Sequence, residues 1–418
     1  MDAAPPRTPA ELPGESSRRA VLATYVAAAA LTSTAYIAVF QNASVAAPAM
    51  TGTATTAGLP SSAGVAGTAA AAALLASLMA TRGRRAGIAL GIGVALVGGL
   101  ITVAAILVSS FLLLVAGALL TGFGNAAIAL SRYAAADLYP DARRGGVVGV
   151  VVWGSTIGAV LGPNLVAPAN ALGMDADLPR FAGAFLASAA LFLLGAAVAL
   201  FGPSAPATRT QDADTGPRLP MRRLLADLLA TPIGRTAVIA LVSGQAVMVL
   251  VMTMTPYELD HRGHGEVVIG LVISAHVLGM FALAPISGRL VDRLGAVRVM
   301  LAGFATLTFA GLLAAAMSGS IGTSLAIPLF LLGFGWNLSF VAGSALLASG
   351  GHYANRARLQ GVVDAFVWGT SALAGVVAGL VVAWLGFAVL ALMGAAVAVV
   401  MAATLALRAG RHEPVTAG

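Results

Sequence analysis

The 418-residue chain lacks cysteine and lysine and has few charged residues of either sign. Without cysteine it cannot form a disulfide, a zinc–thiolate site or a thiol nucleophile. Only 9% of its residues are charged, whereas soluble globular proteins carry about 25%. This scarcity of charge excludes a soluble enzyme, a nucleic-acid-binding module and a disordered scaffold.

Long apolar runs take the place of charge. Hydrophobic residues make up 59% of the chain, and the mean hydropathy is +0.94. One bilayer span needs about 20 predominantly apolar residues, so the chain can supply roughly twelve spans. Runs of this length without apolar/polar alternation predict helices and not barrel strands. The sequence therefore predicts an all-α membrane protein with twelve transmembrane helices. The expected spans are 21–43, 59–80, 86–108, 110–136, 147–170, 181–202, 233–257, 267–288, 296–317, 321–348, 360–384 and 386–408.

The arginines indicate how the chain is oriented. All 23 basic residues are arginine, and with a cytoplasmic N-terminus all but Arg180 and Arg262 fall on cytoplasmic segments or their flanks. This asymmetry follows the positive-inside rule. We therefore expect a multi-pass protein of a bacterial cytoplasmic (inner) membrane, surrounded by the lipid bilayer, with both termini in the cytoplasm. The pI near 10.7 is then an insertion signal and no nucleic-acid partner is expected.

The longest polar segment divides the spans six and six. It contains several prolines and mixed charges, and its part from Met221 to Leu229 predicts a short amphipathic helix on the membrane surface. We expect the chain to act as a monomer. The expected divisions are a cytoplasmic tail (1–19), an N-terminal six-helix half (20–202), a cytoplasmic linker (203–232), a C-terminal six-helix half (233–408) and a second cytoplasmic tail (409–418).

The two halves repeat each other in sequence. Residues 146–156 read GVVGVVVWGST and residues 361–371 read GVVDAFVWGTS, an offset of 215. Gly122-Phe123-Gly124 matches Gly333-Phe334-Gly335 at an offset of 211. An offset of six spans leaves both halves in the same orientation. The sequence therefore predicts two parallel six-helix pseudo-repeats with a binding site between them near the middle of the membrane.

Two motifs resemble signatures of the major facilitator superfamily. The loop between spans eight and nine reads GRLVDRLGAVR, and its matching positions are Gly288, Asp292, Arg293 and Gly295. In span five, the matching positions of an antiporter-type signature are Gly149, Gly158, Gly162 and Pro163. The resemblance implies the fold of that superfamily and transport by alternating access. It also makes Asp292 and Arg293 candidates for a latch that breaks between conformations.

The first-half loop departs from the family pattern. The position of the family's aspartate is Ala80, and the arginine that follows it is Thr81. The arginine often found in span four falls at Ala118, so it cannot take part in coupling. These departures weaken a comparison with proton-coupled drug exporters.

Few ionisable side chains are expected deep in a span, and such residues are functional candidates by default. His276 is the only histidine within an expected span, and Asp364 lies about one turn inside span eleven. Tyr36, Gln41 and Asn42 of span one are polar residues that either line the opposing wall or hydrogen-bond between helices.

Two side-chain pairs point to copper as the substrate. Met248 and Met252 in span seven, and His276 and Met280 in span eight, are each spaced i,i+4 and so share one helix face. Three thioethers and an imidazole at a similar depth suit Cu(I). The arrangement resembles the CcoA-like copper importers of the superfamily, and the resemblance implies that these four residues are copper ligands. His261 and His264 at the outer mouth are candidates for delivering the cation.

Other interpretations of the same residues stay open. Methionines often fill gaps between packed helices, and His276 with Asp364 would serve as coupling residues in proton-coupled efflux of a small organic molecule. The wider family also includes riboflavin-type transporters, and a non-transporting membrane sensor is a further class. No enzymatic constellation and no phosphate-binding Gly-Lys-Ser/Thr loop is present. We expect a secondary transporter that is not an enzyme and needs no cofactor.

Overall fold

The computed structural model describes residues 14–136, 138–139, 141–203, 221–319, 322–349 and 356–410. These residues form helices joined by short connections and include no β-strand. The first six long helices are α1 (Glu15–Thr51), α2 (Gly58–Arg82), α3 (Arg84–Leu107), α4 (Phe111–Ala136), α5 (Asp141–Asp175) and α6 (Ala182–Phe201), with a short 3₁₀ turn, η1 (Ala54–Thr56). The rest are α7 (Met221–Ala230), α8 (Pro232–His261), α9 (Glu266–Phe281), α10 (Ala284–Leu294), α11 (Ala296–Met317), η2 (Gly322–Leu325), α12 (Ala326–Ser349) and α13 (Arg356–Gly410).

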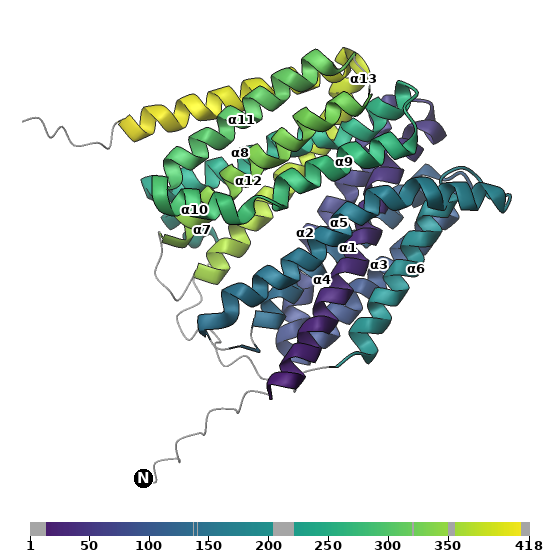
Figure 1. Cartoon of the computed structure of the whole chain (residues 1–418), viewed down its shortest axis with the longest axis horizontal. Helices are drawn as coiled ribbons and strands as arrows, with labels where there is room; N and C mark the ends of the chain where they lie inside the picture. The colour runs from purple at the N-terminus through teal and green to yellow at the C-terminus, as the bar shows by residue number, and fades with distance from the viewer. Residues whose placement is uncertain are drawn as a thin grey trace, which may run out of the picture.

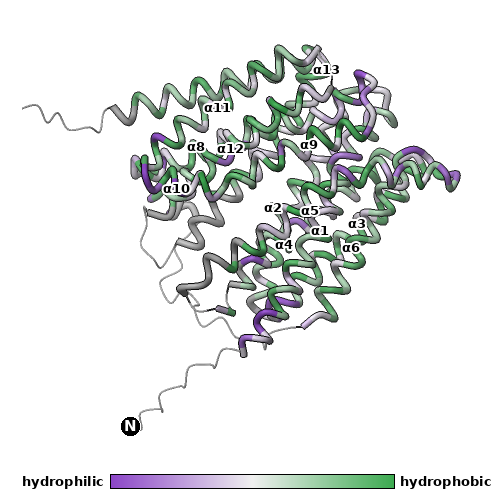
Figure 2. Tube along the Cα trace, in the orientation of Figure 1, coloured by the Kyte–Doolittle hydropathy of each residue, from purple (hydrophilic) through white to green (hydrophobic). Residues whose placement is uncertain are grey.

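The expected fold class is confirmed. Eleven segments of the described chain are long and apolar enough to cross a bilayer. The last of them, Phe366–Leu407, contains two passes, because Gly386 interrupts α13 with φ 82° and ψ 167°. Figure 2 shows hydrophobic residues along the helices and hydrophilic residues mainly near their ends. The protein is therefore an all-α membrane protein with the twelve passes that the sequence predicts.

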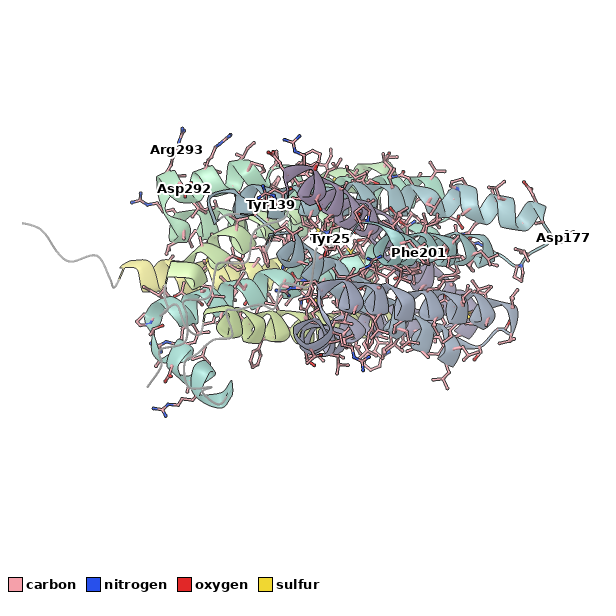
Figure 3. All side chains as sticks on the ribbon, turned by 90° about the horizontal axis from the view of Figure 1, so that it is seen from below. Tyr25, Tyr139, Asp177, Phe201, Asp292 and Arg293 are labelled. Atoms are coloured by element: carbon pink, nitrogen blue, oxygen red, sulfur yellow. The ribbon has the colours of Figure 1, made fainter. Side chains whose placement is uncertain are left out.

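The helices form two groups, α1–α6 and α8–α13 (Figure 1). We call the end of the bundle where α1 begins the N-terminal end, and the end where α5 meets α6 the opposite end. The groups lie together toward the opposite end and diverge toward the N-terminal end (Figure 1). Asp292 and Arg293 lie at the N-terminal end and Asp177 at the opposite end (Figure 3).

The sequence repeat corresponds to a repeat in helix packing. A Cβ at Gly122 of α4 would lie 2.2 Å from the carbonyl oxygen of Gly64 in α2, and a Cβ at Gly333 of α12 would lie 2.3 Å from that of His276 in α9. Small residues let helix backbones approach this closely in a membrane. The same glycine therefore joins the second and fourth spans of each half.

The connections between helices also repeat. Gly83 between α2 and α3 has φ 91° and ψ 159°, and Gly295 between α10 and α11 has φ 82° and ψ 151°. This region of backbone space is open essentially only to glycine. The loop glycine of the superfamily signature thus has a conformational reason to be glycine in both halves.

Span eight differs from its expected form. The sequence predicts one helix over 267–288, whereas the structure has α9 and α10 separated by a break after Phe281. Pro285 in the first turn of α10 has no N–H to continue the α-helical bonding pattern. The predicted linker helix is present as α7, whose Leu228 packs against Ala237 and Leu241 of α8.

Candidate functional site

The two side-chain pairs lie at the same depth in the second half. Met252 and Met248 precede the end of α8 at His261 by nine and thirteen residues, and His276 and Met280 follow the start of α9 at Glu266 by ten and fourteen. At 1.5 Å per residue, both pairs lie about 14–21 Å from the opposite end. Met248, Met252 and His276 are buried, and Met280 is half-buried.

The helix α12 packs against both helices that carry the pairs. His276 Nδ1 lies 2.9 Å from the carbonyl oxygen of Leu329 in α12, and Met280 lies beside Gly333 of the same helix. On the other side, Trp336 of α12 donates its indole N–H to Gln245 of α8 at 2.7 Å. The pairs are therefore carried by two helices that pack on one central helix.

His276 has one satisfied and one unsatisfied ring nitrogen. The Leu329 carbonyl can only accept, so Nδ1 carries the hydrogen and Nε2 keeps its lone pair. Nε2 is buried and has no hydrogen-bond partner among the described residues, and the whole residue is 0% exposed. A backbone carbonyl that fixes the tautomer and orientation of an imidazole is the usual support of a metal-binding histidine. The geometry leaves Nε2 available as a ligand.

Trp336, which bonds to the amide group of Gln245, is part of an aromatic cluster. Trp336 stacks on Phe340 with ring centroids 4.8 Å apart, and Phe281 meets its edge at 6.1 Å. Gln245 and Trp336 are both buried. Flat aromatic rings and one amide are groups that orient an organic ligand in an apolar site.

Polar contacts join the halves toward the opposite end. Asn164 of α5 donates to Ser274 of α9 at 2.7 Å, and Asn170 of α5 donates to both carboxylate oxygens of Glu266 at 3.1 Å. Asn170 also donates to Asn42 at 3.2 Å. In this conformation a network of amides, of which Asn42 and Asn170 are buried and Asn164 is exposed, closes the bundle at the opposite end.

The two arginines that break the sequence asymmetry lie at this closed end and are both neutralised. Arg180 forms an ion pair with Asp260 across the halves at 2.8 Å. Arg262 pairs with Glu258 on α8. His261 is exposed and stacks on Tyr257, and His264 is half-buried. The described residues contain no group of three or more His, Asp or Glu that could hold a metal ion, so these histidines form no metal cluster there.

The span-five signature serves two contacts. A Cβ at Gly158 would lie 2.3 Å from the carbonyl oxygen of Ala30, and one at Gly162 would lie 2.7 Å from that of Thr34. These glycines let α5 pack on α1 within the first half. Pro163 instead faces the second half, because a Cβ at Gly270 of α9 would lie 2.9 Å from its carbonyl oxygen. Of the signature residues whose surroundings are described, Pro163 alone lies between the halves.

The loop signature makes no latch in this conformation. Asp292 and Arg293 are exposed at the end of α10, and neither has an ion-pair partner among the described residues. Both side chains extend away from the bundle in Figure 3. A Cβ at Gly288 would meet open space. Any latch by Asp292 belongs to another conformation.

Some candidates lie outside the described side chains. Asp364 lies in α13 and Gly149 in α5, but the surroundings of both fall outside the described residues. Of the polar residues in span one, Asn42 donates to the carbonyl oxygen of Phe181 at 2.9 Å. It therefore bonds between helices of the first half.

Sequence reasoning missed several residues that the structure brings together. Glu266, Asn170 and Asn337 lie near the ends or in the middle of apolar spans, and each is explained only by a partner on a distant helix. An acid directly after the outer loop was the one available signal for Glu266. Asn170 and Asn337 carry no charge, so a search for ionisable residues within the spans does not find them.

Two six-helix repeats that share one orientation and pack on each other are the architecture of a membrane transporter. The sequence profile of the Major Facilitator Superfamily matches residues 22–267 and 236–417, and the chain belongs to this family. It is a secondary transporter of a small-molecule substrate and not an enzyme. The prediction of the superfamily is confirmed, and copper as the substrate stays a prediction.

The relatives agree on transport and differ in what is known of them. The uncharacterized MFS-type transporter YddS of Bacillus subtilis is 33% identical over 322 residues, 75% of this chain and 73% of its own. The riboflavin transporter RfnT of Brucella anthropi is 32% identical over 322 residues, 74% and 78% of the two chains. The human organic anion transporter MFSD10 matches 93% of this chain and 99% of its own with a TM-score of 0.63. At 16% identity, that last likeness shows the fold alone.

Proposed function

We propose that the protein imports copper(I) across a bacterial cytoplasmic membrane by alternating access. The observation that carries this proposal is His276, whose Nδ1 is held by the Leu329 carbonyl while the buried Nε2 has no hydrogen-bond partner in the part of the chain that the structure describes. Met280 lies one turn further along α9, and Met248 and Met252 lie at the same depth on α8. Thioether and imidazole ligands select Cu(I) over hard cations.

The orientation of the chain in the membrane defines which conformation the structure describes. With arginines concentrated in the cytoplasm, the N-terminal end of the bundle faces the cytoplasm. The opposite end, closed by the Asn170–Glu266 and Asn164–Ser274 bonds, then faces outward. The described conformation is inward-facing under this orientation. Transport requires a second conformation in which these outer contacts open.

The test is uptake of Cu(I) by purified protein in proteoliposomes, in the presence of a reductant. We expect Met252→Ala and His276→Ala to lower uptake at least tenfold per folded protein, because each removes a ligand. The matched control is Met254→Ala, another buried methionine of α8, which should keep uptake. Wild-type uptake by both site variants would refute the copper site.

A second candidate is uptake of a flat organic solute such as riboflavin. Two observations favour it: the stacked Trp336–Phe340 rings beside Gln245, and the 32% identity to a riboflavin transporter. Uptake of external riboflavin by the same proteoliposomes distinguishes between the two candidates. Riboflavin uptake that is lost in Trp336→Ala but kept in His276→Ala would support the organic solute. Export of a toxic organic compound, with no change in the copper content of the vesicles, would instead indicate an efflux transporter.

A further inference from the structure

The break in span eight leaves backbone groups that need partners. Pro285 cannot donate to the carbonyl of Phe281, so the helical bonding pattern stops between α9 and α10. A bilayer offers no water to such groups, and a break is stable only where protein satisfies them. One of these groups, the carbonyl of Met280, is satisfied by Asn337 of α12.

Asn337 bonds to both sides of the break. Its Nδ2 donates to the carbonyl oxygen of Met280 at 2.6 Å, and its Oδ1 accepts a hydrogen bond from the hydroxyl of Ser287. Asn337 is 3% exposed and Ser287 is 0% exposed. One buried side chain therefore ties the last turn of α9 to the first turn of α10.

The first half has neither the break nor the clamp. At the offset of 212 that relates α2 to α9, Pro285 corresponds to Ala73 and Ser287 to Leu75. At the offset of 211 that relates α4 to α12, Asn337 corresponds to Ala126. The helix α2 runs without interruption from Gly58 to Arg82. Break and clamp therefore occur together and only where a proline interrupts the helix.

We propose that Asn337 is a positioning residue that sets the angle between α9 and α10. The helix α9 carries His276 and Met280, and α10 ends in the exposed Asp292 and Arg293. A fixed angle couples the position of the Met280 backbone in the site to that of the charged end of α10. The effect on transport rests on the proposed function, whereas the effect on the angle does not.

The angle can be measured in the absence of substrate. Because the chain has no cysteine, single cysteines can be labelled without removing others. Val267 is 72% exposed at the start of α9 and Leu294 is 49% exposed at the end of α10. Spin labels on Val267→Cys and Leu294→Cys would be about 40 Å apart on a straight helix, because the two positions are about 27 steps of 1.5 Å apart. A bent span gives a shorter distance.

We expect a narrow distance distribution in the labelled chain that has no other change. Asn337→Ala should broaden this distribution and lower copper uptake at least tenfold. Pro285→Ala added to Asn337→Ala should return a narrow distribution near the straight-helix value, without restoring uptake. The matched control is Asn125→Ala, which removes the α4–α2 hydrogen bond to Thr68 in the first half and should leave the distribution unchanged.

An unchanged distribution in Asn337→Ala overturns the proposal, whatever the vesicles transport. If that variant does not fold, Ser287→Ala decides, since it removes only one of the two bonds: an unbroadened distribution again overturns the proposal. A clamp effect on distance combined with no copper uptake in the unmodified chain would reject the proposed function and leave the clamp standing.

Discussion

The second and fourth spans of each half pack in the same way but carry different side chains. In the first half, α4 approaches α2 through Gly122 at Gly64, and in the second, α12 approaches α9 through Gly333 at His276. A second pair repeats the contact from the other side: a Cβ at Gly67 would lie 1.9 Å from the carbonyl oxygen of Leu119, and one at Gly279 would lie 2.2 Å from that of Phe330. These two glycine–carbonyl contacts therefore occur at matching positions in both halves.

The chemistry on this scaffold is not symmetric. The positions of His276 and Met280 are occupied in the first half by Gly64 and Thr68, and Thr68 uses its hydroxyl to bond the Gly64 carbonyl at 3.0 Å. The same helix is continuous in the first half and broken in the second. At these matching positions the first half therefore has only packing contacts, whereas the second half has the proposed ligands and a bend in the helix.

The largest expected effect comes from filling the shared glycine contacts. Gly122→Val and Gly333→Val both drive a side chain into a backbone carbonyl, which we expect to cost roughly 3 kcal/mol or more and to abolish folded protein. The measurement is the monodisperse yield after purification. Gly93→Val is the control, because a Cβ at Gly93 meets open space. If only one of the two variants fails to fold, the symmetry of the scaffold is incomplete.

The loop glycines give a smaller effect that should also be equal in both halves. Gly83→Ala and Gly295→Ala place a Cβ where φ is +91° and +82°, a strain of about 2 kcal/mol. We expect a lower unfolding temperature in both variants, measured in detergent, and no loss with Gly93→Ala. A loss of transport in Gly295→Ala without a loss of stability would show that this glycine acts in a gate instead.

Removing a buried contact between the halves should shift the balance between the outer-closed and the outer-open state. Asn170→Ala removes the hydrogen bonds to Glu266 that join the two halves, and we expect a loss of about 1.4 kcal/mol from the outer-closed state. That amount is a roughly tenfold shift toward the outer-open state. Spin labels on Leu172→Cys and Val267→Cys, both exposed beside this contact, would report the longer distance. An unchanged distance would show that other contacts hold the end closed.

The scaffold could be predicted from the sequence because it depends on local patterns. Apolar runs give the spans, and the repeated Gly-Phe-Gly gives the relation between halves. The break in span eight was not predicted, although Pro285 is visible, because prolines also occur inside unbroken helices of this chain, such as Pro48 in α1. Whether a proline breaks a helix depends on a partner such as Asn337, which lies about fifty residues away.

The candidate site could be predicted only in part, for the same reason. The i,i+4 spacing places Met248 with Met252 and His276 with Met280 on their helix faces. It does not say which neighbour each face meets, and the structure turns His276 toward Leu329. The outer contacts of Asn170 were invisible because an amide within an apolar run has no partner until the helices pack.

The smallest expected effect is at the exposed ion pair that crosses the halves. Arg180 and Asp260 are 52% and 27% exposed at their side chains, and such pairs contribute about 0.5 kcal/mol or less. Arg180→Gln should therefore shift a much smaller fraction of molecules to the longer Leu172–Val267 distance than Asn170→Ala does. High salt should have the same small effect on the unmodified chain. The comparison is sharp because both contacts join the same two halves at the same end. A shift by Arg180→Gln as large as that by Asn170→Ala would mean that charge, and not the buried amide network, holds the outer end closed.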